Sequence, residues 1–117
     1  MDPIHPEGAI MADLATVARI PNVASAVLGD AAGGFYDAIR EQDGEAVASV
    51  AAFVTTSLAQ AGEELGLGPL RRVAVAGEKR ALLVAAAGDA LVTARIEPPA
   101  ALAAVERAFD TSVGTGG

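Results

Sequence analysis

The stretch AVASVAAFVTTSLAQAG, residues 46–62, has the composition of a helix, yet it carries no charged side chain on any face. A surface helix normally sets a polar stripe opposite its apolar one, so a helix without that stripe is expected to be covered on two sides. Placing its residues at 100° steps gives one aliphatic side, which we predict to face the core. This side comprises Val47, Val50, Val54, Leu58, Ala61 and Leu65, with Ser57 at its edge.

The opposite side of this helix is small and nearly neutral. It comprises Ala48, Ser49, Ala52, Thr55, Thr56 and Ala59. Small side chains let another helix come close, so we predict a protein interface here, most simply with the same helix of a second copy across a twofold axis. A solvated surface of Ala, Ser and Thr is the alternative. A membrane span needs about 20 mostly apolar residues, and the interrupting Ser, Thr and Gln side chains argue against one.

Length and composition limit what the rest of the chain builds. The 117 residues suffice for one hydrophobic core and not for two. Because only 3% of them are aromatic, Ala, Val, Leu and Ile must supply the packing, and such a core is expected to leave no sizeable apolar pocket. The chain has no cysteine, which excludes disulfides and thiolate metal sites and fits a cytoplasmic protein. The acidic, proline-containing start does not resemble a secretory signal.

The charge of the chain is unevenly distributed. Residues 1–64 sum to −8 and residues 65–117 to +1, which gives the net charge of −7. Binding to nucleic acid needs a basic surface, so we do not expect it. The basic side chains of the second half form either a modest positive patch or strand-end charges that discourage aggregation. They include Arg71, Arg72, Lys79, Arg80 and Arg95.

Periodicity and turn residues predict the order helix, two strands, helix, three strands, helix. The predicted helices cover residues 9–18, 44–65 and 100–109, and the predicted strands cover 23–28, 35–41, 70–76, 80–87 and 90–96. Short connections make the last three strands an antiparallel meander. Residues 81–87 are all apolar, without alternating polar residues, which indicates a strand covered on both faces. Asp43 is expected to cap the long helix with its carboxylate, and Gly66 to end it. We expect residues 1–8 to be disordered and residues 111–117 to be a flexible tail.

This order, together with local signals in register, resembles the roadblock family, also called the dynein light chain seven family. The signals are Ile20-Pro21-Asn22-Val23 before the first strand, Asp30 followed by Gly33-Gly34, Leu65-Gly66-Leu67-Gly68 after the long helix, Leu70-Arg71-Arg72-Val73-Ala74-Val75, and the turn Gly88-Asp89. The resemblance covers about residues 9–109 and implies a single roadblock domain over residues 9–110. It implies a profilin-like, layered α/β fold, with a five-stranded antiparallel sheet between the long helix and the two terminal helices.

The resemblance also implies partners. Family members pair as homodimers or heterodimers, with the long helices side by side and the third strands joined, which adds Arg71, Val73 and Val75 to the predicted interface. Bacterial members of the family are similar to proteins that bind small Ras-like GTPases. The resemblance therefore implies a regulatory or scaffold dimer, with itself or a paralogue, that binds such a GTPase and modulates its cycle. A ligand-sensing or structural subunit of a signalling assembly, without a GTPase partner, is the alternative.

The inventory of reactive residues favours a noncatalytic protein. The single histidine, His5, lies in the leader, so no serine has a histidine partner for a nucleophilic triad. The loop at residues 29–34 lacks the GK[ST] and the following helix of a phosphate-binding loop. The aspartates Asp30, Asp37, Asp43 and Asp89 are explained mostly as turn and cap residues. We therefore predict no enzyme, no catalytic residue, no metal and no cofactor.

Overall fold

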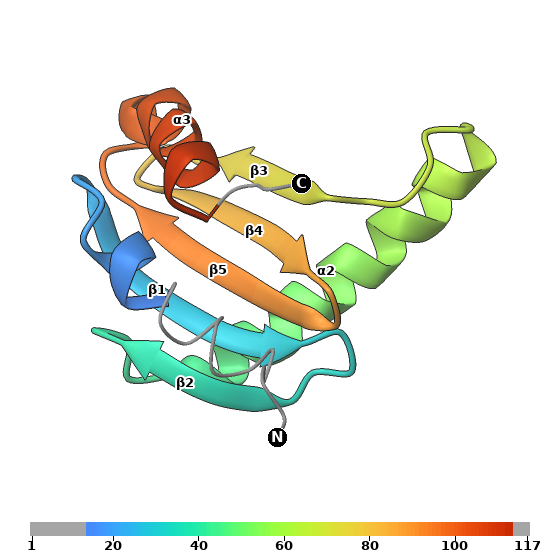
Figure 1. Ribbon diagram of the computed structural model, residues 1–117, viewed down its shortest axis with the longest axis horizontal. Helices are drawn as coiled ribbons and strands as arrows, with labels where there is room; N and C mark the ends of the chain where they lie inside the picture. Colours follow the sequence, from blue (N-terminus) through green and yellow to red (C-terminus); the bar gives the residue numbers. More distant parts are fainter. Residues whose placement is uncertain (1–13, 114–117) are drawn as a thin grey trace, which may run out of the picture.

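Five strands form one antiparallel sheet in the order β2-β1-β5-β4-β3 (Figure 1). The computed structural model describes residues 14–113. Its strands are β1 Val23–Asp30, β2 Phe35–Ile39, β3 Arg72–Ala76, β4 Ala81–Ala87 and β5 Ala90–Ile96. Its helices are α2 Gly44–Glu64, the short 3-10 helix η1 Pro99–Ala101 and α3 Leu102–Val113, and residues 14–18 are helical as well. The predicted fold class and element order are confirmed.

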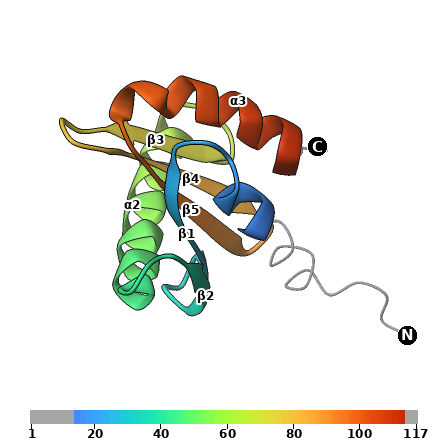
Figure 2. The same ribbon diagram turned by 90° about the vertical axis from the view of Figure 1, so that its left-hand side faces the viewer.

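The sheet separates two layers of unequal depth (Figure 2). On one face, residues 14–18 and α3 cover the larger core, whose fully buried members include Leu14, Leu28, Leu83, Val105 and Phe109. On the other face, α2 covers a smaller cluster made by Ala51, Ala52, Val84 and Leu91. Most of the buried apolar surface, and hence most of the hydrophobic stabilisation, therefore lies on the α3 side.

The ends of α2 agree with the prediction, although one cap works differently. Gly66 has a φ of 72°, and the amides of Gly66 and Leu67 donate to the carbonyls of Glu63 and Gly62, which is the Schellman pattern. At the other end Asp43 occupies the N-cap position, but its carboxylate caps no amide of the helix. The prediction of a side-chain cap at Asp43 is wrong. Its own amide donates instead to Glu41 Oε2 over 3.2 Å.

Other boundaries differ by a few residues. Strand β2 ends at Ile39 because Arg40 has a φ of 61°, which no extended strand adopts. Helix α3 continues to Val113, so residues 111–113 are helical and do not belong to a flexible tail. The predicted leader at residues 1–8, the start of the first helix at 9–13 and the rest of the tail at 114–117 lie outside the described residues.

Candidate functional site

Helix α2 lies on the sheet through its small residues. Ala48, Ala51 and Ala52 are buried and face the sheet. The approach is close: a Cβ added to Gly29 of β1 would come within 2.9 Å of the Ala48 Cβ, below ordinary van der Waals contact. At the start of the helix, Gly44 meets the Phe35 ring in the same way. Larger side chains on this side would push the helix off the sheet.

The aliphatic side of α2 lies beside the contact between the helix and the sheet and is not part of the buried core. Val50 is 58% exposed and Leu65 73% exposed, Leu58 is exposed too, and Val47 and Val54 are half-buried. The predicted assignment of the two sides is therefore wrong. Periodicity correctly grouped the residues by side, but the small side packs on the sheet because a helix approaches an Ala- and Val-rich sheet most closely where its own side chains are short.

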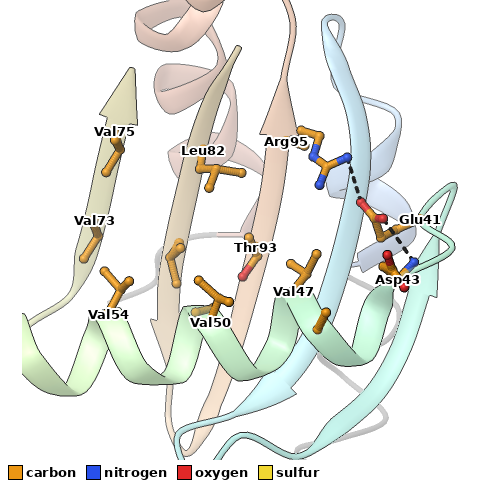
Figure 3. A pocket seen from close by; sticks show the side chains of 13 residues that line it. Glu41, Asp43, Val47, Val50, Val54, Val73, Val75, Leu82, Thr93 and Arg95 are labelled. Atoms are coloured by element: carbon orange, nitrogen blue, oxygen red, sulfur yellow. Dashed lines mark hydrogen bonds and ion pairs between the residues drawn. The ribbon is translucent and has the colours of Figure 1, made fainter. Parts of the chain in front are cut away.

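The exposed aliphatic side of α2 forms one wall of a long groove (Figure 3). The groove has a volume of about 530 Å³ and lies over the part of the sheet that α2 leaves uncovered. Its helical wall is Ala46, Val47, Val50, Ala51 and Val54, and its floor is Val73 and Val75 of β3, Leu82 and Val84 of β4, and Thr93 of β5. The expectation of no sizeable apolar pocket is wrong: the core is closely packed, and the hollow lies beside the helix.

One end of the groove is polar. Arg95 Nη1 lies 3.2 Å from Glu41 Oε1, and Ser25 Oγ donates to the same oxygen over 3.2 Å. The Glu41 side chain is only 8% exposed, whereas that of Arg95 is 32% exposed. Because the carboxylate is buried and satisfied, it fixes the guanidinium in place. The exposed part of Arg95 is thus a positioned positive charge at the rim of an apolar surface.

The last turns of α2 extend beyond the sheet. Figure 1 shows the carboxyl-terminal end of the helix projecting past the ends of the strands. Apart from Gly62, no residue of α2 after Ala52 is buried, and the exposed apolar side chains Leu58, Leu65 and Leu67 line this end. We call residues 58–67 the overhang. It carries Glu63 and Glu64 and no basic residue in its last turn.

The two edge strands of the sheet differ. On β2, the Asp37 carboxylate accepts the amide of Ala38 over 2.8 Å, which occupies a donor of that edge. On β3, the Arg72 guanidinium lies 5.6 Å from the centre of the Phe109 ring and pairs with Asp110 of α3. That hydrogen bond holds the pKa of the Asp110 carboxyl below its ordinary value. Arg72 thus ties α3 to the sheet beside the unpaired edge of β3.

Residues 10–94 match the family model described as the Roadblock/LC7 domain. The chain belongs to this family. Among solved structures, it is similar to MglB of Myxococcus xanthus, with 15% identity, 86% of this chain and 85% of that chain covered, and a TM-score of 0.76. A Roadblock/LC7 domain from Streptomyces avermitilis shares 19% identity over 86% of this chain and 93% of that one, with a TM-score of 0.66.

A third structure, an MglB with a tetrameric arrangement, shares 20% identity over 92% of this chain and 88% of that one, with a TM-score of 0.71. At these identities the likenesses show the fold. A comparison with curated proteins gave no significant match. Membership of the family supports a regulatory, roadblock-type protein.

The predicted interface residues of this roadblock domain fall into two groups. Val73 and Val75 line the groove and Arg71 is exposed at the start of β3, so these three remain predicted interface residues. The small residues of α2 do not belong to this remaining predicted interface. Ala48 and Ala52 are covered by the sheet of their own chain, Ser49 and Thr56 are exposed away from the groove, Thr55 donates to the Ala51 carbonyl over 2.6 Å, and Ala59 is half-buried.

Sequence reasoning missed Leu82 and Arg95 as residues of the groove. The only sequence signal at Leu82 was the continuous apolar segment 81–87, which predicts a strand covered on both faces. On the α2 face, Leu82 is only half-buried and Ala86 is exposed, because α2 packs on β1, β2 and β5. No sequence signal placed Arg95 beside this apolar surface.

The other candidate sites have structural explanations. The Asp30 carboxylate accepts hydrogen bonds from the hydroxyl of Tyr36 and from the amides of Gly34 and Ala32, which lower its pKa and shape the β1–β2 turn. Among residues 14–113, no group of His, Cys, Asp and Glu side chains is arranged to hold a metal ion. No helix in this part of the chain combines the length and the apolar character needed to cross a membrane. His5 lies outside the described residues.

Proposed function

We propose that this roadblock domain is a noncatalytic, cytoplasmic regulatory protein that forms a dimer and binds a small Ras-like GTPase, whose cycle it modulates. The observation that supports this most is the large apolar surface on the α2 face, made of the groove and the overhang. A monomeric protein rarely leaves an apolar surface of this extent in water, and such surfaces mark sites of protein association.

The unpaired edge of β3 supplies a second part of the proposed dimer. In an antiparallel pair of β3 strands, about a twofold axis perpendicular to the sheet, the two sheets become one, and both α2 helices lie on the same face. Arg71, Val73 and Val75 then lie at the seam. The donor occupied by Asp37 on β2 favours β3 as the edge that pairs. The tetrameric arrangement named for an MglB relative supports association in general.

The proposed regulation needs no catalytic group from this chain. Arg72 is held by Asp110 and Phe109, so its guanidinium is not available for insertion into a GTPase active site. Arg71 is exposed, but it lies at the predicted seam. We therefore expect the domain to act by positioning the catalytic groups of the GTPase itself, in place of supplying an arginine finger.

The experiment is a pull-down of the tagged protein from its native lysate, with GDP in one arm and a nonhydrolysable GTP analogue in the other. We expect mass spectrometry to identify a small GTPase in the GTP-analogue arm only. The purified pair is then tested for a change in hydrolysis rate. Recovery of only the protein itself, a paralogue or a sensor protein in both arms would contradict GTPase binding.

The second candidate function is a ligand-sensing subunit, because the groove has the volume of a small-molecule site. The two candidate functions differ in the kind of molecule that covers the apolar surface of the groove. A sensing domain binds a small apolar compound in the groove as a monomer, whereas the proposed regulator covers the groove with protein. Retention of a small molecule by the purified monomer, detected by native mass spectrometry, would favour the sensing function.

A further inference from the structure

We infer that the outer edge of β2, together with the β1–β2 turn, binds a basic segment of a further partner protein. We call this surface the aromatic edge, and it comprises Phe35, Tyr36 and Asp37 of β2 and the turn residues 30–34. Strands β2 and β3 form opposite edges of the sheet (Figure 1). The inference therefore goes beyond the proposed function, because the aromatic edge stays free when β3 edges pair.

The chain has few aromatic residues, and most of them lie at the surface. It contains three Phe, one Tyr and no Trp. Of these, Phe109 is buried, whereas Phe35 is 38% exposed, Tyr36 44% and Phe53 73%. A core of small aliphatic residues would gain most from burying such rings, and aromatic side chains are enriched at protein-binding surfaces. Two of the three exposed rings are neighbours on one edge strand.

A β-bulge determines how Tyr36 is presented at this edge. In the register of β1 and β2, Leu28 pairs with Asp37 and Gly29 pairs with Phe35, so Tyr36 is the extra residue on β2. A bulge bends its strand and changes the direction of the side chain of the extra residue. The Tyr36 ring therefore does not follow the in-and-out alternation of a regular strand.

Both rings are held in place by their own chain. The Tyr36 hydroxyl donates to Asp30 Oδ2 over 2.6 Å, and Asp30 Oδ1 in turn accepts two amides of the β1–β2 turn. The Phe35 ring packs against the start of α2, where a Cβ added to Gly44 would come within 2.5 Å of the Phe35 Cε1. A ring that is already fixed loses little conformational freedom on binding, so it is an effective anchor for a partner.

The charges around the two rings are all negative. Residues 28–39 and 43–57, which form β2, the turn and the first half of α2, contain no Lys or Arg. Arg40, between these ranges, donates its guanidinium to backbone carbonyls of its own chain. The surface therefore attracts cationic groups and repels phosphate, which excludes nucleic acid and anionic lipid as occupants. The acidic residues are Asp30, Asp37, Asp43 and Glu45.

A basic protein segment matches both features of the aromatic edge. A guanidinium stacks on an aromatic face and pairs with a carboxylate, so we expect an Arg of the partner on Tyr36 beside Asp37. Asp37 Oδ1 accepts the amide of Ala38 over 2.8 Å, which fixes this carboxylate at the edge. An apolar side chain beside the Arg covers the exposed part of Phe35. A small cation alone would leave Phe35 in water.

The first test locates the site with a synthetic probe, a peptide of alternating Arg and Leu. We expect saturable binding to the isotope-labelled full chain, with the largest amide chemical-shift changes in residues 30–38. A peptide of alternating Glu and Leu is the control for apolar association and should not bind. Absence of saturable binding by the Arg peptide would overturn the inference, as would shift changes concentrated in the groove or the overhang.

The second test compares two exposed rings. Tyr36→Leu removes the ring but keeps an apolar side chain, and we expect it to weaken binding of the Arg peptide by at least about threefold. Phe53→Leu makes a similar change on α2, outside the aromatic edge, and should alter binding by less than about 1.5-fold. Fluorescence anisotropy measures both dissociation constants, and circular dichroism checks that both variants fold. Equal effects of the two substitutions would overturn the inference.

The third test compares two carboxylates and does not depend on the folding of Tyr36→Leu. Asp37→Asn keeps an oxygen for the amide of Ala38 but removes the charge, so binding of the Arg peptide should weaken by about two- to fivefold at low salt. Glu64→Gln removes the same charge from the far end of α2 and should leave binding within about 1.5-fold of the wild type. A larger effect of Glu64→Gln would show that only the net charge of the chain attracts the peptide.

These outcomes are distinguishable from a failure of the proposed function. A chain that dimerises and recovers a small GTPase, but does not bind the peptide at residues 30–38, contradicts only the inference. A chain that binds the peptide there, but recovers no GTPase with either nucleotide, contradicts only the proposed function.

Discussion

Small residues decide which side of α2 meets the sheet. The near contact between Gly29 and Ala48 leaves no room for a larger side chain at either position. A rule that places the largest apolar residues in the core predicts the wrong side here. Helical periodicity shows which residues share a side of a helix, but the choice of side depends on the shape of the opposing surface. The glycines and alanines of the opposing strands are the sequence feature that would have predicted the correct side of α2 against the sheet.

Ala52 tests this conclusion at the level of one residue. Ala52→Leu overfills the contact with Val84 and Leu91, so we expect the free energy of unfolding to fall by about 1–3 kcal/mol. The matched control, Ser49→Leu, adds a similar side chain on the exposed side and should change stability by less than about 0.5 kcal/mol. Urea unfolding at equal protein concentration measures both. Equal stability of the two variants would argue against the assignment of sides made here.

Asp110 gives a prediction about pH. Its pKa lies below the ordinary value of 3.8 because Arg72 donates to the carboxylate. A carboxyl whose pKa is lowered by folding adds stability above its ordinary pKa and loses that contribution as the pH falls through the lowered value. Asp110→Asn is therefore expected to lower the thermal midpoint at neutral pH and to match the wild type well below pH 3.8.

The control for this prediction is Asp89→Asn, a substitution in the turn between β4 and β5 that makes no contact with Arg72 in the described part of the chain. Thermal unfolding at the two pH values compares the variants directly. A deficit of Asp110→Asn that is the same at neutral and acidic pH would show that the ion pair is not its cause.

At the scale of elements, turn residues predicted the limits of α2 and of β5 because glycine and proline act locally. The end of β2 was predicted two residues too far along the chain. Arg40 leaves the strand conformation and its guanidinium donates to the carbonyls of Ala18, Val23 and Ala24, residues far away in sequence. A local sequence pattern does not predict such long-range hydrogen bonds.

Two glycines near the end of α2 give opposite predictions. Gly66 has a φ of 72°, so Gly66→Ala should destabilise the protein by about 1 kcal/mol although its new methyl meets no atom within 4 Å. Gly62 is helical and has room for a methyl, so Gly62→Ala should stabilise it by up to about 1 kcal/mol. Chemical unfolding of both variants measures the difference. Changes of the same sign would contradict the Schellman end of this helix.

On the scale of the whole molecule, the candidate site arises because the sheet is wider than the helix that covers it. Helix α2 packs mainly on β1, β2 and β5 and meets β4 at Val84, but it leaves Val75 of β3 exposed and Leu82 of β4 half-buried. The sequence predicted the sheet, the helix and, through the family resemblance, the β3 residues Val73 and Val75. It did not predict the groove, because the position of a helix across a sheet depends on tertiary packing and not on the local pattern of either element.

The central claim is that two copies of this chain cover one another on the α2 face. The most direct test is the mass of the wild-type protein, measured by sedimentation equilibrium over a wide concentration range. We predict a reversible dimer of about twice the chain mass of 11.6 kDa. A mass of 11.6 kDa at every concentration would contradict the account.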